Sequence, residues 1–169
     1  MTLPLGPLLT SMRSMHTNHS ATTTDTIMPS SALQAPAHRS RALHVTLWIV
    51  QVLLAAFFLM AGVNHGLKPI AEAAQSSPWI TGVPVWLARF IGFAEIAGAV
   101  GLVVPAATRV KPWLTPLAAA GLAVIMALAV PFHVMRGEAG VIAFNIVPAL
   151  LAAFVAWGRS TRARIAPRA

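Results

Sequence analysis

Long apolar runs alternate with short polar stretches along the chain after residue 43. The four runs cover residues 44–64, 86–104, 113–134 and 140–157. As an α-helix the first run rises roughly 31 Å, which matches the hydrocarbon core of a bilayer. A soluble protein with four such runs has no polar helix faces left for water. The pattern therefore predicts an all-α integral membrane protein, a four-helix bundle in which each run crosses the bilayer.

Prolines, glycines and polar residues mark the ends of these runs. Pro105 is expected to end the second span, and Pro116 falls in the first turn of the third, where a missing amide proton costs little. Between the spans we expect a longer loop over 65–85, a basic turn over 105–112 and a tight turn over 135–139.

Residues 1–42 differ from the rest of the chain. They are rich in Ser, Thr, Pro and Ala and show no apolar periodicity, a composition typical of disorder. Three further methionines in this stretch offer alternative translation starts. We therefore expect a disordered polar tail over 1–42, a four-span membrane domain over 43–159 and a basic tail over 160–169.

Composition agrees with a bilayer protein and excludes several kinds of chemistry. Hydrophobic residues make up 57% of the chain and charged residues only 9%, against roughly 25% charged residues in an ordinary soluble domain. The chain has no cysteine, which excludes disulfides, thiolate catalysis, thioether-attached haem and cysteine-ligated iron–sulfur clusters. The tails are too short for a soluble catalytic domain. We predict neither catalytic residues nor a metal site.

The net charge of +8 is distributed around the apolar runs. Because the basic residues do not form a stripe, we expect the lipid bilayer as partner and no nucleic acid. With four spans, both ends of the chain share one side of the membrane. That side carries eight basic residues and the other at most three, namely Arg39, Arg41, Arg109, Lys111, Arg159, Arg162, Arg164 and Arg168 against Lys68, Arg89 and Arg136. The positive-inside rule then places both termini in the cytoplasm.

This orientation brings polar side chains from four spans into the outer half of the bilayer. The predicted cluster consists of Asn64, His65, Arg89, Glu95, His133 and Asn145. In the inner half, the notable polar side chain is Gln51. Ionisable groups inside a membrane favour function, but buried polar networks also fix how helices pack. The sequence leaves both a functional pocket and a packing network open.

Glu95 is the most informative member of the cluster, because it lies near the predicted midplane. An ionised carboxylate at that depth costs roughly 3 kcal/mol, so Glu95 must be protonated, paired or in contact with water. Arg89 lies about 120° away around the helix and roughly 9 Å along it, which allows only partial reach. Water, His133 or Asn145 are the other expected partners.

The two histidines of the cluster allow a second interpretation. Two histidines on facing helices can bind haem, but both lie at span ends and neither has a flanking motif, so haem is not the expected cofactor. His133 fits the polar cluster, and His65 fits either the cluster or the membrane interface. Asn145 is expected to bond between helices or to backbone freed by Pro148.

The stretch FLMAGVNHGLKPI is followed by RFIGFAEIAGAVGLVVPAATRVKPWLTPLAAAGL and, after a histidine, by RGE. Over roughly residues 45–159 the chain resembles the DoxX-like family of small bacterial membrane proteins, most specifically from Arg89 to Pro105. The resemblance implies a four-helix protein of the bacterial cytoplasmic (inner) membrane. Arg89, Glu95 and His133 match positions of the family pattern. Related DoxX proteins are linked to membrane redox complexes, including a thiosulfate:quinone oxidoreductase.

Three functions fit these observations. The leading hypothesis is a noncatalytic accessory subunit of a membrane redox system, with quinone in an apolar cleft that has few polar groups. Its partners are then other redox subunits or a second copy of the chain. A small proton-coupled transporter, with Glu95 as the proton carrier, is the second hypothesis. A structural membrane partner without chemistry is the third.

Overall fold

The computed structural model describes residues 35–168, with side chains from residue 41 onward. Its long helices are α1 (Ala35–Gly66), α3 (Val85–Thr108), α4 (Leu114–Met135) and α5 (Ala139–Trp157). Short elements are α2 (Ile70–Ser76), the 3₁₀-helix η2 (Pro78–Gly82) and the π-helix η3 (Gly158–Arg162). Four segments of the described chain are long and apolar enough to cross a membrane. The predicted all-α architecture with four spans is confirmed.

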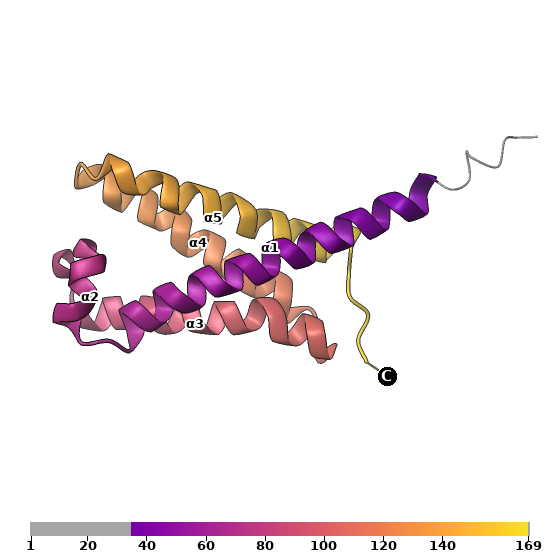
Figure 1. The fold of residues 1–169 in the computed structure, drawn as a ribbon, viewed down its shortest axis with the longest axis horizontal. Helices are drawn as coiled ribbons and strands as arrows, with labels where there is room; N and C mark the ends of the chain where they lie inside the picture. The colour runs from indigo at the N-terminus through magenta and orange to yellow at the C-terminus, as the bar shows by residue number, and fades with distance from the viewer. Residues whose placement is uncertain (1–34, 169) are drawn as a thin grey trace, which may run out of the picture.

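The helices are arranged as two closely packed pairs. α1 packs along α3, α4 packs along α5, and α3 and α4 join the pairs, while α1 and α5 touch over little of their length. We call the left end of Figure 1 the α2 end; it holds α2, η2 and the turn over 136–138. The right end, called the terminal end, holds the start of α1, the turn over 109–113 and residues 158–168.

Several boundaries differ from the sequence prediction. α1 begins at Ala35, so the expected boundary at residue 43 lies inside this helix, while residues 1–34 of the expected tail lie outside the described part. Pro36 does not prevent this start, since proline is tolerated in a first helical turn. α3 continues through Pro105 to Thr108, which corrects the expected end. A backbone in lipid has no water to bond, so the helix persists beyond a proline until a polar turn.

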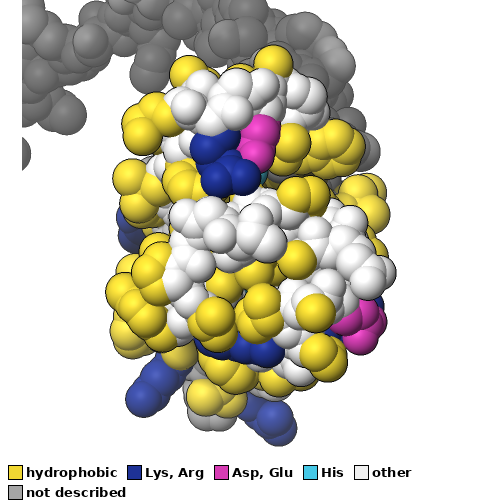
Figure 2. Space-filling view, turned by 90° about the vertical axis from the view of Figure 1, so that its left-hand side faces the viewer, with side chains coloured by type: hydrophobic (Ala, Val, Ile, Leu, Met, Phe, Trp, Pro, Cys, Tyr) yellow, Lys and Arg dark blue, Asp and Glu magenta, His cyan; other side chains and the backbone are white. Residues whose placement is uncertain are grey.

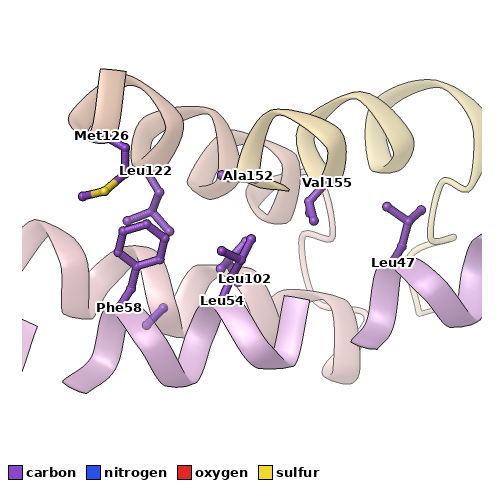
Figure 3. Packing of buried hydrophobic residues seen from close by; sticks show 10 residues of the cluster. Leu47, Leu54, Phe58, Leu102, Leu122, Met126, Ala152 and Val155 are labelled. Atoms are coloured by element: carbon purple, nitrogen blue, oxygen red, sulfur yellow. The ribbon is translucent and has the colours of Figure 1, made fainter. Parts of the chain in front are cut away.

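The core occupies the middle of the bundle and its terminal half. Figure 3 shows Phe58 and Leu54 of α1 facing Leu122 of α4, with Leu102 of α3 and Val155 of α5 beside them. All five side chains are at most 3% exposed. Lipid tails are as apolar as these side chains, so close van der Waals packing rather than escape from water stabilises the contact.

Glycines bring α1 and α3 into backbone contact near the α2 end. A Cβ atom on Gly92 would overlap the backbone nitrogen of Gly66, and one on Gly62 would lie 2.7 Å from the Gly92 oxygen. The last turn of α1 therefore lies beside the third turn of α3 rather than beside its start. α2 and η2, in place of the expected loop over 65–85, occupy the space beyond the end of α1.

Candidate functional site: a polar cavity at the α2 end

The α1–α3 contact pairs a histidine with the intramembrane acid. Nδ1 of His65 lies 2.8 Å from Oε2 of Glu95, and the two side chains are 10% and 2% exposed. His65 is not among the partners expected for Glu95, because the sequence places His65 at a span end and Glu95 near the midplane. The depth of Gly66 beside Gly92 explains the pair.

A serine of the α2–η2 segment continues this hydrogen-bond chain. Oγ of Ser77 lies 3.1 Å from Nε2 of His65 and accepts from Nδ2 of Asn64 at 3.2 Å. The partners fit one arrangement, in which His65 donates from Nδ1 to the carboxylate and accepts the Ser77 hydroxyl proton at Nε2. The Oδ1 atom of Asn64 accepts from Ser76 at 3.2 Å. The result is a directed relay from Asn64 through Ser77 and His65 to Glu95.

Arg89 supports this relay from outside. Its Nη1 donates to the main-chain oxygen of His65 at 3.1 Å instead of reaching Glu95. That oxygen is among the last carbonyls of α1, where a cation also interacts favourably with the helix dipole. Arg89 therefore fixes the end of α1 and does not neutralise Glu95 directly.

A second histidine–carboxylate pair lies at the turn between α4 and α5. Nδ1 of His133 lies 2.6 Å from Oε2 of Glu138, and Nε of Arg136 donates to Oε1 at 2.8 Å. The hydrogen bond from His133, and then that from Arg136, lowers the pKa of the Glu138 carboxyl below its ordinary value of 4.5. His133 is 5% exposed, and its partner Glu138 is a residue that the sequence did not single out.

Asn145, also buried, bonds within its own helix. Its Nδ2 donates to the Val141 oxygen at 3.0 Å. It therefore neither crosses to α3 nor reaches the carbonyl of Phe144, which lies four residues before Pro148. Its side chain belongs to the wall of the cavity described next.

Aromatic rings connect the two histidines. Trp79 of η2 lies edge-on to His65 with ring centroids 5.1 Å apart, and Phe132 lies between Trp79 and His133 at 6.4 and 5.4 Å. Arg136 stacks over Phe132 at 5.4 Å and also lies against Gly82. These contacts hold η2 over the α4–α5 turn and cover the end of the bundle.

A cavity of about 1050 Å³ lies among α1, η2, α3, α4 and α5 at this end. Five of the six predicted cluster residues line it, namely Asn64, His65, Glu95, His133 and Asn145. Figure 2 shows the surface at this end, where acidic side chains lie next to basic ones. This agrees with the ion pairs Lys68–Glu72 and Arg136–Glu138. The structure thus gathers on one cavity the side chains that the sequence assigned to one membrane depth.

The cavity continues as an apolar groove between α1 and α5. This groove has a volume of about 450 Å³, and its walls include Leu53, Val147 and Pro148. Phe57 and Phe144 belong to both spaces. Because α1 and α5 scarcely touch, the polar cavity has an apolar approach along the side of the bundle.

The polar side chains around His65 are joined to one another by hydrogen bonds. Within residues 41–168 no group of three or more His, Cys, Asp or Glu side chains is placed to hold a metal ion. Both ring nitrogens of His65 lie within hydrogen-bond distance of a neighbouring side chain.

A second polar network lies at the terminal end. Nε of Arg159 donates to Oε1 of Gln51 at 2.5 Å, and Nε2 of Gln51 donates to the Leu102 oxygen at 2.6 Å. Nη1 of Arg159 contacts His44 at 3.1 Å, and its guanidinium stacks over Trp48 at 5.4 Å. The sequence singled out Gln51 but counted Arg159 only as a flanking charge.

The model of the DoxX-like family matches residues 49–155, which is more than half of the chain. The chain belongs to the DoxX-like family. In this DoxX-like chain the match includes every residue that lines the polar cavity, and with them both histidine–carboxylate pairs. Comparisons with curated proteins and with solved structures find no match.

Proposed function

We propose that this DoxX-like protein binds a lipid-soluble quinone in the α2-end cavity, as an accessory subunit of a membrane redox system. The supporting observation is the position of the buried His65–Glu95 pair on the wall of a large cavity with an apolar approach. Binding pockets of this kind are mostly apolar with a few convergent polar groups. The redox partner and the cytoplasmic position of both termini belong to the same proposal.

The relay suits a ligand with carbonyl or hydroxyl oxygens. Ser77 and Asn64 present a hydroxyl and an amide beside His65, and all three line the cavity. Glu95 orients the ring of His65, so the relay can give a proton to a ligand oxygen or take one from it. The protein then positions the ligand and exchanges its protons, while electrons pass to or from another subunit.

The apolar groove suits the tail of the same ligand. Quinones of membranes carry a long apolar chain, and Leu53, Val147 and Pro148 offer a surface for it. The tail would leave the site between α1 and α5 and enter the lipid without crossing a charged surface. A ligand of this class therefore matches both the polar cavity and its approach.

Quinone binding can be measured on the purified protein in detergent or nanodiscs. Decylubiquinone, the probe, should quench tryptophan fluorescence in a saturable way, because Trp79 lies on the cavity wall; Trp79→Phe should remove much of the signal. Glu95→Gln should weaken binding about tenfold, because an amide orients the ring of His65 less strongly than a carboxyl group does. Glu72→Gln is the matched control, since Glu72 pairs with Lys68 at the surface.

The same variants separate the proposal from its alternatives. If decylubiquinone does not bind saturably to the wild-type protein, the proposal of a quinone site is wrong. The transporter hypothesis instead predicts proton flux in liposomes that Glu95→Gln abolishes. The described core, with Leu54, Leu102 and Leu122, consists of closely packed apolar side chains, which supports binding rather than transport.

A further inference from the structure

The α3–α4 turn and the end of the chain bring basic residues together at the terminal end. The main-chain nitrogen of Arg168 donates to the oxygen of Arg109 at 3.0 Å. Residues almost sixty positions apart are thereby joined, and the side chains of Arg109, Lys111 and Arg168 are all exposed. The sequence showed these residues as two separate basic stretches, and the fold makes them one basic cluster.

No carboxylate within residues 41–168 balances this basic cluster. The carboxylates of that range, Glu72, Glu95 and Glu138, belong to α2, the middle of α3 and the α4–α5 turn. The ion pairs found in the same range involve none of the three cations. Like charges held near one another are destabilising, so an anion bound there would stabilise the arrangement.

An apolar groove of about 500 Å³ begins beside the same turn. It runs between α3 and α4 from Pro105 and Leu114 toward Gly98 and Ile125. Gly121 lies on its wall, where a Cβ atom would meet nothing within 4 Å. The groove is therefore open space along the membrane-facing side of the two helices.

We propose that the basic cluster and the α3–α4 groove form a binding site for an anionic phospholipid. The phosphate contacts Arg109, Lys111 and Arg168, and one acyl chain lies in the groove. Trp113, which is 60% exposed beside the cluster, has the amphipathic ring typical of the headgroup level. An apolar groove next to the basic cluster fits an anionic molecule with an apolar tail. A free anion would occupy the basic cluster but leave the groove empty.

Native mass spectrometry on protein mixed with equal amounts of phosphatidylglycerol and phosphatidylcholine tests this site. Wild-type protein should retain phosphatidylglycerol preferentially. In the triple variant Arg109→Gln/Lys111→Gln/Arg168→Gln, the ratio of retained phosphatidylglycerol to phosphatidylcholine should fall about tenfold. The bond that joins positions 168 and 109 uses main-chain atoms only, so these side-chain substitutions preserve the fold of the turn. Phosphatidylglycerol should also raise the melting temperature of wild-type protein more than phosphatidylcholine does.

Two matched controls distinguish a site from general charge attraction. Arg41→Gln/Arg162→Gln/Arg164→Gln removes the same charge from the same end and should keep most of the preference. Gly121→Leu should fill the groove and reduce retention, while its neighbour Ala120→Leu, outside the groove, should not.

Three results would overturn the proposal. The first is equal retention of the two lipids by wild-type protein, together with equal shifts of its melting temperature. The second is equal loss of preference from both triple variants, which would show diffuse attraction only. The third is binding of inorganic phosphate as tight as that of the lipid, which would show an anion site without a role for the groove.

Discussion

The two buried polar networks of the bundle differ in their surroundings, because only one of them lines a cavity. At the terminal end, Gln51 and Arg159 bond to each other and to a main-chain oxygen, and neither lines any of the three cavities described above. At the α2 end, His65 and Glu95 are also buried but line a cavity. Buried polar side chains thus serve as a structural connection at one end and as a candidate site at the other. Free space beside the polar atoms, not polarity itself, separates the two.

Removing Gln51 should produce the largest loss of stability. Gln51→Leu deletes the acceptor of the buried Arg159 guanidinium, whose Nη2 already has no partner among the described residues. Loss of a buried hydrogen bond to a charged group costs about 3 kcal/mol. Reversible unfolding in mixed micelles should show this loss, with little change in quinone binding by the protein that stays folded.

The double variant Gln51→Leu/Arg159→Leu is the control for this prediction. It removes the charge together with its partner, so most of the lost stability should return. If the single and double variants were equally unstable, the network would contribute packing volume rather than hydrogen bonding to the buried guanidinium, and the comparison between the two ends would weaken.

Gly92→Ala should affect both stability and the site. The added methyl group would meet the backbone of Gly66 and His65, so α1 and α3 must separate. Overpacking of this kind costs about 2 kcal/mol, and the separation should lengthen the His65–Glu95 contact and weaken quinone binding. Gly121→Ala, in open space, should leave both properties unchanged or slightly raise stability. Normal binding by Gly92→Ala would separate the pair from ligand recognition.

Glu95→Gln should have the opposite effect to that expected for Gln51→Leu, with a small loss of stability and a large loss of quinone affinity. The amide can still accept a hydrogen bond from His65, so the loss of stability should be about 1 kcal/mol, while quinone affinity falls about tenfold. A loss of stability as large as that of Gln51→Leu, with unchanged affinity, would mean that the α2 end is a second structural network.

Glu138 should show the smallest effect, confined to acid pH. Its pKa is lowered in the folded protein by His133 and then Arg136. A carboxyl whose pKa is lowered by folding stabilises the protein above its unfolded pKa, and this contribution disappears as pH falls through the lower folded value. The melting temperature of wild type should therefore exceed that of Glu138→Gln at pH 7, and the difference should shrink below about pH 4.5. A difference independent of pH would contradict the ion-pair interpretation.

The sequence predicted the spans well because lipid imposes a simple rule on them. A backbone in hydrocarbon must satisfy itself, so long apolar runs become helices, and four of these were identified. Membrane depth also grouped Asn64, His65, Glu95, His133 and Asn145, which the structure places on one cavity. The sixth residue, Arg89, contacts the end of α1 instead.

The hydrogen-bond partners of these residues were harder to predict from the sequence than their depth in the membrane. The pairing of His65 with Glu95 depends on α1 ending beside Gly92, and hydropathy does not report such an offset between helices. Ser77 and Trp79 reach the site through short helices within a stretch that the sequence indicated only as a loop. Glycines at 62, 66 and 92 are the one signal that could have indicated the close α1–α3 approach.

The sparse contact between α1 and α5 leaves one side of the bundle unsealed toward the lipid. A molecule dissolved in the surrounding lipid can reach the polar cavity by lateral diffusion, without passing through water. Its effective concentration is therefore its mole fraction in the membrane. Occupancy in a cell would follow the lipid composition of the bilayer, and affinities measured in micelles become comparable only when they are expressed per mole of detergent or lipid.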